Sequence, residues 1–230
     1  MVFDYEDSTK NAYKNPTVVQ KYHTDFSGRV GWRTFRFHYI ARKERELVNG
    51  LLSLIRAESI LDIPCGTGKL AVLLAKRSGR IVAADISEDM LKVAKQSYMA
   101  AGCDDRVSFA VGDVEHLCDH FGNLELDAVV CLRLMHRVPT ETRKRMLDQI
   151  ARTAKYAVIS FGIDSPYHKL RKKLRRLMFG GAVPDLCLEG IENIRREIAT
   201  AFHIERECRI SPLMSEEVLF LLRSKAKARA

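Results

Sequence analysis

The chain has 230 residues, of which 47% are hydrophobic and 29% are charged. This composition is sufficient to bury a core, so it excludes intrinsic disorder as the main state, and the length suits one α/β domain with additions. No apolar run approaches the roughly 20 residues of a membrane-spanning helix. The net charge of +9 favours an anionic partner or surface.

The six cysteines and the start of the chain bear on its location. No two cysteines form a C-x-x-C pair, and in a chain of this length their spacing is typical of free thiols in a reducing cytosol. The acidic first ten residues are unlike a signal peptide. We therefore expect a cytoplasmic protein without a bound metal.

The first 55 residues are expected to form a helical extension that acts as a lid. A short helix is predicted near 16–22 and a longer helical region over 30–55, where apolar residues recur on one stripe. The stretch 22–36, which overlaps both helices, is rich in aromatic residues and arginine. Within it Tyr22, Trp32 and Arg33 could close over a bound ligand, and an ordinary helix packed on the domain is the alternative.

A core domain is expected over 56–222, because short apolar runs alternate there with helical patterns. The predicted strands are 59–63, 80–84, 107–111, 126–132 and 156–161, and the predicted helices are 68–76, 87–99 and 139–154. Ser87 is expected to cap the second of these helices. This alternation predicts a parallel sheet with helices on both faces.

After the fifth strand the pattern becomes irregular. A basic cap insertion is expected over 164–188, then a helix over 189–202, an antiparallel pair of strands at 204–210 and 218–222, and a basic tail over 223–230. Residues 167–179 of the insertion predict an amphipathic helix with leucines on one face and six basic residues on the other. Such a helix could be a lid with a solvated face, a membrane or lipid contact, or an RNA contact.

A glycine-rich loop at 61–71 carries the strongest functional signal. It follows a strand and precedes a helix, so its backbone can approach a ligand closely. A phosphate-binding P-loop is excluded, because Leu70 follows Lys69 and Ile63 stands where the first glycine should be. Gly66, Gly68 and the alanine at 71 match a dinucleotide loop, which taken alone is a weak signal.

Three carboxylates follow three successive strands and narrow the choice of ligand. Asp62 is well placed for an ammonium group, and Asp85, about 20 residues after the loop, for ribose hydroxyls. Asp113 could accept a hydrogen bond from the amino group of adenine, or it could cap the following helix. A ligand with an amine, a ribose and an adenine but no phosphate fits this set, and S-adenosylmethionine is such a ligand.

The motifs ILDIPCGTGKLA, AADISEDML, VGDVEHL and DAVVCLRLMHRVP together resemble those of class I S-adenosylmethionine-dependent methyltransferases. They are similar in particular to the small-molecule group of the quinone-biosynthesis C-methyltransferases, and the resemblance spans about 30–222. It implies a Rossmann-like, doubly wound α/β fold. Its seven-stranded sheet would be mostly parallel with an antiparallel last strand.

The resemblance also implies a set of cofactor-binding residues. These are Asp62, Cys65, Gly66, Gly68, Asp85, Ile86, Met90, Asp113, Val114 and Leu132. The lid predicted from the N-terminal stretch could add Arg33 and Tyr22 to this set. At the end of the fourth strand, Cys131 and Leu132 would line the methyl-transfer site. His136, just beyond, is a candidate general base or substrate-orienting residue, and Arg133 a candidate contact for an acidic substrate.

The function expected from these features is methyl transfer from S-adenosylmethionine to a small molecule of amphiphilic or acidic character. An RNA or tRNA methyltransferase is an alternative, motivated by the positive charge. A regulatory protein that binds the cofactor without catalysis is another, and a nicotinamide-dependent dehydrogenase is a more distant one. A peripheral position at the inner face of a membrane would follow if residues 167–179 contact lipid.

Overall fold

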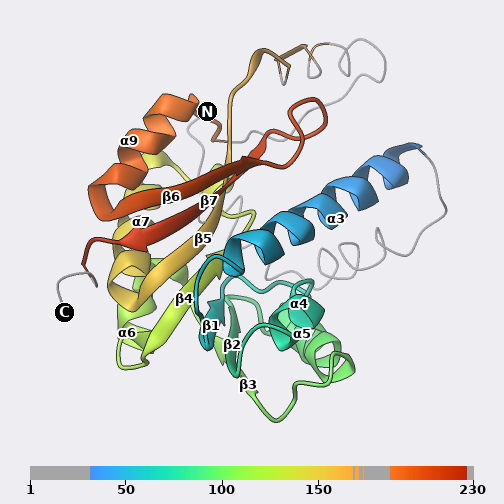
Figure 1. The fold of residues 1–230 in the computed structure, drawn as a ribbon, viewed down its shortest axis with the longest axis vertical. Coiled ribbons are helices and arrows are strands. Elements are labelled where there is room, and N and C mark those ends of the chain that lie inside the picture. The colour runs from blue at the N-terminus through green and yellow to red at the C-terminus, as the bar shows by residue number, and fades with distance from the viewer. Residues whose placement is uncertain (1–31, 168, 171–172, 174–186, 227–230) are drawn as a thin grey trace.

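A computed structural model describes residues 32–167, 169–170, 173 and 187–226 (Figure 1). Side chains are described from residue 36 onward. The expected helix near 16–22, Tyr22 and the side chains of Trp32 and Arg33 lie outside these described parts. So does most of the predicted amphipathic helix 167–179.

The seven strands that the structure describes form a single sheet in the order β3-β2-β1-β4-β5-β7-β6. Their bounds are β1 Ser59–Asp62, β2 Arg80–Asp85, β3 Val107–Val111, β4 Leu126–Cys131, β5 Ala154–Gly162, β6 Phe202–Arg209 and β7 Glu217–Ser224. The first five strands pair in parallel, and β7 runs antiparallel to both β5 and β6. The predicted mostly parallel sheet with an antiparallel last strand is confirmed.

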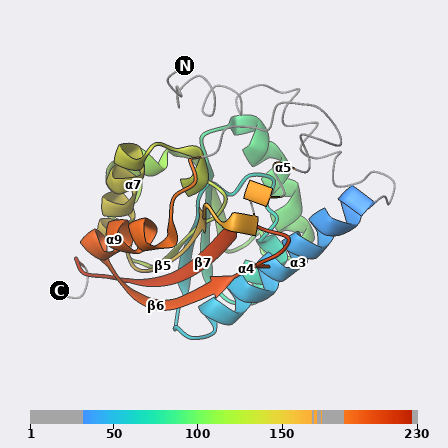
Figure 2. The same cartoon turned by 90° about the horizontal axis from the view of Figure 1, so that it is seen from above.

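Helices cover both faces of the sheet, as the doubly wound prediction requires (Figure 2). Their bounds are α3 Trp32–Leu52, α4 Ala71–Ala75, α5 Glu88–Ala100, α6 Leu117–Phe121, α7 Thr140–Thr153 and α9 Ile191–Ala201. The first three pack on one face and the last three on the other, so two separate hydrophobic clusters flank the sheet. Neighbouring residues of a strand point to opposite faces, and Ile60 accordingly belongs to one cluster and Leu61 to the other.

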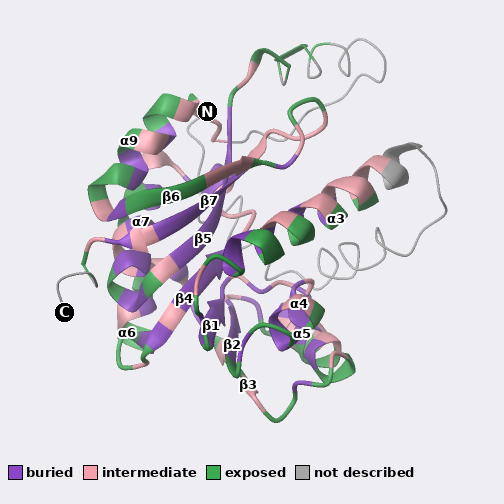
Figure 3. Ribbon diagram, viewed as in Figure 1, coloured by how far each residue is buried: buried purple, intermediate pink, exposed green. Residues whose placement is uncertain are grey.

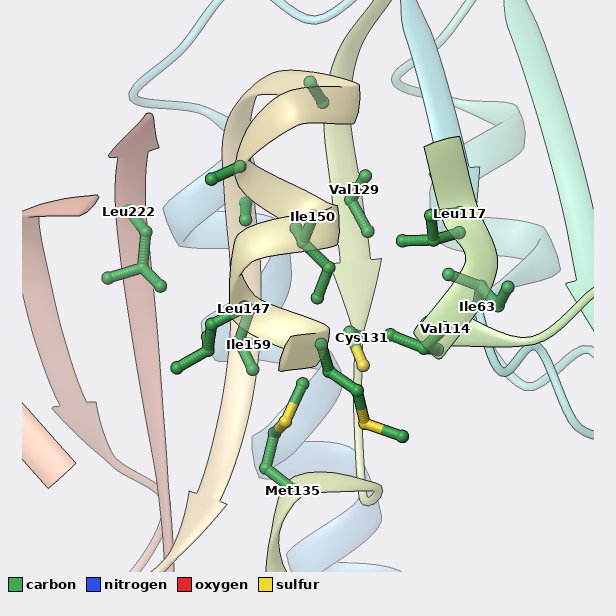
Figure 4. Packing of buried hydrophobic residues seen from close by; sticks show 14 of the residues in the cluster. Ile63, Val114, Leu117, Val129, Cys131, Met135, Leu147, Ile150, Ile159 and Leu222 are labelled. Atoms are coloured by element: carbon green, nitrogen blue, oxygen red, sulfur yellow. The ribbon is translucent and has the colours of Figure 1, made fainter. Parts of the chain in front are cut away.

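The central strands are buried on both sides, and exposed residues concentrate on the outer helix faces and on β6 (Figure 3). In the cluster beneath α7, Leu147 and Ile150 face Val129 and Ile159 of the sheet (Figure 4). All four side chains are fully buried. Each contributes roughly 1.5–3 kcal/mol of hydrophobic stabilisation, which holds the strand ends in fixed positions.

Helix α3 confirms the long helical region predicted before the first strand. Its C-terminal half packs on the sheet through Val48 and Leu51, which are almost fully buried. Nearer its start, the Arg36 guanidinium donates two hydrogen bonds, of 3.1 and 2.7 Å, to the carbonyl oxygen of Met214 in the loop between β6 and β7. The helix is thereby tied to the sheet at two places, and its role as a lid stays a prediction.

Two local differences from the sequence predictions have clear physical causes. The helix expected from residue 68 begins only at Ala71, because Gly68 adopts a φ of 75° that no right-handed helix contains. The helical turns Val114–His116, α6 and Met135–Arg137 were not predicted, since segments of three to five residues are too short to show a helical period.

The basic insertion is described only in part. Residues 166–167, 169–170 and 173 are helical, and the side chains of Tyr167 and Leu170 are more than half exposed. The choice between a lid, a lipid contact and an RNA contact for residues 167–179 therefore stays open. Among the helices that the structure describes, none combines the length and apolarity needed to cross a membrane.

Candidate functional site

The carboxyl ends of β1 and β2 and the segment after β3 surround one cavity. Asp62, Asp85 and Asp113 all line it, so the structure brings together the three carboxylates that the sequence placed at successive strand ends. The rest of the wall comes from the glycine-rich loop, the start of α5, the segment after β4, and α3. Its residues are Ala41, Glu44, Arg45, Ile63, Pro64, Cys65, Gly66, Thr67, Lys69, Leu70, Ile86, Met90, Gly112, Val114, Leu132, Arg133, Leu134 and Arg137.

The two loop glycines do different things. Gly66 has a φ of 54°, lines the cavity, and donates its N–H to the Asp85 carboxylate at 2.9 Å. Gly68 has a φ of 75° and lies against α5, where a Cβ atom would come within 2.9 Å of the Cβ of Ser97 and 3.1 Å of Ala94. Gly68, predicted to pass beneath the cofactor, therefore does not line the cavity but lets the loop approach α5.

Asp85 is almost fully buried and fastens the loop to β2. One carboxylate oxygen accepts from Gly66, and the other accepts from the N–H of Ser87 at 3.0 Å. Burial raises the pKa of Asp85, and the hydrogen bonds from Ser87 and Gly66 act in the opposite direction. Asp85 therefore fixes the turn between β2 and α5, while it also lines the cavity.

Asp62 lies deep in the wall with 3% of its surface exposed. The hydroxyl of Tyr98 donates a 2.8 Å hydrogen bond to its carboxylate. Burial raises the pKa of Asp62 to about 7, and the nearby Asp85 adds to that effect, while the hydrogen bond from Tyr98 opposes it. Sequence reasoning missed Tyr98, although its spacing from Met90 and Ala94 places it on the buried face of α5.

One part of the cavity lining is apolar and contains one carboxylate. Met90 and Val114 are buried, and both line the cavity together with Ile86. Asp113 accepts a 3.0 Å hydrogen bond from the N–H of Glu115, so it does cap the helical turn that follows. The contact predicted between Asp113 and the amino group of adenine stays a prediction.

Arg133 lines the wall of the cavity that adjoins α3. It is the one residue other than glycine with a positive φ, 60°, among those that the structure describes, and its N–H donates to the Ser160 hydroxyl at 2.7 Å. Its guanidinium donates to both carboxylate oxygens of Glu44 in α3, at 3.0 and 2.7 Å. Glu217 lies next to Glu44, and burial raises the pKa of Glu217 to about 8. Glu44 is 89 residues from its partner, so no sequence signal pointed to this pair.

Three further cations line the same wall, namely Arg45, Lys69 and Arg137. The Lys69 amine lies 5.9 Å from the centre of the Phe37 ring. Burial, and then the neighbouring Arg133, lower the pKa of Lys69 to about 7. The cavity therefore has an acidic side at the strand ends and a basic side beneath α3.

His136 and Cys131 are not among the residues that line this cavity. The structure places His136 in the core beside Gly162, whose Cβ would come within 2.7 Å of the Cβ of His136. Burial, with Arg137 and Arg133 nearby, lowers the pKa of His136 to about 3, and its Nδ1 atom has no hydrogen-bond partner among the described residues. Burial also raises the pKa of the Cys131 thiol. Leu132 does reach the cavity, as predicted.

Residues 60–156 match the family model described as a methyltransferase domain. Among curated proteins, the chain is 30% identical over 124 residues to the chloroplastic magnesium protoporphyrin IX methyltransferase of Arabidopsis thaliana, covering 53% of this chain and 38% of that protein. It is 39% identical over 101 residues to a demethylmenaquinone methyltransferase of Clavibacter sepedonicus, covering 44% and 38%. The matches thus span less than half the length of these relatives.

Solved structures share the fold over more of the chain. The magnesium protoporphyrin IX methyltransferase of Synechocystis PCC 6803 with bound SAH superposes with a TM-score of 0.77 at 20% identity, covering 95% of this chain and all of that one. The N-methyltransferase NodS of Bradyrhizobium japonicum gives a TM-score of 0.61 at 16% identity, with coverages of 80% and 96%. At these identities the likeness establishes the fold.

Proposed function

We propose that the chain, whose residues 60–156 match a methyltransferase-domain family model, binds S-adenosylmethionine and transfers its methyl group to a small acidic molecule. The observation that carries the proposal is the convergence of Asp62, Asp85 and Asp113 on one cavity. Carboxylates at this place would repel a pyrophosphate, which disfavours a dinucleotide. They attract a cationic nucleoside with hydroxyl and amino groups to donate.

Each part of the site matches one part of that ligand. Asp62 would hold the amino group, and Asp85 would accept hydrogen bonds from the ribose hydroxyls. The adenine would lie on Met90 and Val114 with its amino group at Asp113. Gly66 lines the cavity and has no side chain, so the ligand could approach its backbone closely.

Methyl transfer requires little of the protein beyond the alignment of the donor and the acceptor. Bound S-adenosylmethionine supplies a methyl group that its sulfonium already activates. The chain's residues then have to orient donor and acceptor in line and exclude water. Leu132 and Leu134 offer apolar surface at the end of β4 for this purpose. His136, buried outside the cavity wall, has no assigned step in this scheme.

The acidic character of the acceptor is inferred from the basic side of the cavity. Arg45, Lys69, Arg133 and Arg137 line it, while Glu44 is the one carboxylate among the lining residues on that side. With several basic side chains to one carboxylate, this side of the lining favours an anionic acceptor group such as a carboxylate. The names of the relatives, which include protoporphyrin and quinone methyltransferases, support a small-molecule acceptor.

Binding of the cofactor product tests the first half of the proposal. We expect S-adenosylhomocysteine to bind in calorimetry and NAD⁺ not to bind. Asp85→Asn should weaken S-adenosylhomocysteine by about tenfold or more, because charge-assisted hydrogen bonds are lost. Asp127→Asn is the matched control, since Asp127 likewise accepts from two backbone N–H groups, those of Glu58 and Ser59, but lies outside the cavity. Equal losses in both variants would contradict the assignment.

Labelled cofactor tests the second half. Small-molecule cell extract is first separated on an anion exchanger, and each fraction is then incubated with purified protein and methyl-labelled S-adenosylmethionine. We expect label in molecules that, before methylation, are retained by an anion exchanger. Label confined to neutral or cationic acceptors, or to added tRNA, would refute an acidic small-molecule acceptor.

A cytoplasmic location and lipid contact through residues 167–179 stay predictions from the sequence. Co-flotation with vesicles tests the second of these. Binding to vesicles containing anionic phospholipid, and not to neutral ones, would support it.

A further inference from the structure

A single tyrosine hydroxyl reaches the cavity's deepest carboxylate from a neighbouring helix. Resting on the function proposed above, we propose that Tyr98 is a positioning residue of the cofactor site. Its hydroxyl holds the ionised carboxylate of Asp62 in place for the amino group of the cofactor's methionine part. The 2.8 Å hydrogen bond between two almost fully buried side chains carries this inference.

Helix α5 presents Tyr98 to the site in a fixed orientation. Met90, Ala94 and Tyr98 follow each other at intervals of four residues and form the buried face of the helix. The Tyr98 ring meets the ring of Phe109 edge-on, with centroids 5.7 Å apart and planes at 79°. The aromatic contact fixes the ring, and so the hydroxyl points at the carboxylate without a choice of rotamers.

Helix α5 packs in turn on the glycine-rich loop, 61–71, in which Asp62 lies. Gly68 packs closely on Ala94, and the Ser97 hydroxyl donates to the carbonyl oxygen of Thr67 at 2.8 Å. These two contacts fix the distance between α5 and the loop. The hydroxyl of Tyr98 and the carboxylate of Asp62 therefore belong to one rigid unit.

The groups around Asp62 determine whether its carboxyl is ionised, and Tyr98 favours the ionised form. Asp85 at the end of β2 is a like charge, and it disfavours a second ionised carboxylate. Cys65 in the loop and Cys131 on β4 face the group as thiols whose pKa values burial raises, so they carry no charge. Among the described groups that act on Asp62, Tyr98 alone favours the ionised form. That form is the one able to bind an ammonium group.

A purely structural role makes different predictions from a positioning role. If Tyr98 only fills the core and satisfies its own hydroxyl, its loss should loosen the whole site. If it acts through Asp62, its loss should affect only ligands that carry the amino-acid part. S-adenosylhomocysteine has that part and 5′-methylthioadenosine lacks it, so the two ligands separate the two roles.

The test is Tyr98→Phe, which keeps the ring and removes the hydroxyl. We expect the dissociation constant of S-adenosylhomocysteine at pH 7 to rise by about tenfold, the usual effect of losing a hydrogen bond to a buried charged group. The affinity for 5′-methylthioadenosine should stay within about twofold. In the wild type, affinity for S-adenosylhomocysteine should increase as the pH rises through about 7, where Asp62 ionises. In the variant that increase should move upward by about one pH unit.

Ser97→Ala is the matched control on the same helix, because it removes a hydrogen bond to the loop but none to Asp62. It should weaken both ligands alike and leave the pH profile in place. In an Asp62→Asn background, Tyr98→Phe should have no further effect on S-adenosylhomocysteine, and this measurement serves if Tyr98→Phe alone folds poorly. Equal weakening of both ligands by Tyr98→Phe, or an unchanged pH profile, would overturn the inference. A wild type that binds neither ligand would instead refute the proposed function.

Discussion

Replacing Asp62 with asparagine should stabilise the ligand-free protein at alkaline pH while it weakens the cofactor site. The folded protein raises the pKa of this carboxyl from 3.8 to about 7. Between these values the folded state holds a proton that the unfolded chain releases, so stability falls as the pH rises through this window. At about 1.4 kcal/mol for each pH unit, the full loss is about 4 kcal/mol above pH 7.

The Asp62→Asn variant should not lose this stability as the pH rises, because asparagine does not titrate and can still accept the hydrogen bond from Tyr98. Urea unfolding at pH 5.5 and 8.5 measures the effect. The same arithmetic predicts that the free energy of unfolding of Asp62→Asn exceeds that of wild type by about 2 kcal/mol at pH 5.5 and by about 4 kcal/mol at pH 8.5. Asp127→Asn should instead lower the free energy of unfolding, since hydrogen bonds from Ser59 and Glu58 hold the pKa of Asp127 below its usual value. An Asp62→Asn variant no more stable than wild type at pH 8.5 would refute the reasoning.

Further substitutions test the packing of the glycine-rich loop and the buried ion pair between α7 and α9. Gly68→Ala should lower the free energy of unfolding by about 2–4 kcal/mol, because both the positive φ and the close contact with α5 resist a Cβ. Gly50→Ala in α3, where a Cβ meets nothing within 4 Å, should instead add about 0.5–1 kcal/mol in the same urea experiment. Arg143→Met should cost about 3–5 kcal/mol, since it leaves buried Glu197 without the guanidinium that donates to it at 2.6 and 2.8 Å. Thermal unfolding should show part of that loss restored by adding Glu197→Gln, and no restoration would count against the ion pair as its cause.

The order of the elements and the strand ends could be predicted because local patterns encode them. The central strands are apolar on both faces, so their runs were visible without knowledge of their neighbours. Ser87 was recognised as a helix cap from its residue type, and its hydroxyl does accept from the N–H of Met90. Parallel strands place their carboxyl ends at one edge of the sheet, and this rule alone brought Asp62, Asp85 and Asp113 together.

The partners of those side chains were decided by tertiary packing. Tyr98 reaches Asp62 across 36 positions of sequence, and Glu44 reaches Arg133 across 89, so no local spacing indicates either pair. His136 was expected to face the crevice because it follows a strand end, but the chain after β4 turns it into the core.

The sequence by itself therefore determined the fold and the acidic side of the cavity, since both follow from local periodicity and from the geometry of parallel strands. Only the tertiary structure decided which charges are buried, which are paired, and where the basic side lies. Burial and pairing depend on the distances between side chains on α3, α5 and the sheet, and such distances exist only once the elements have packed.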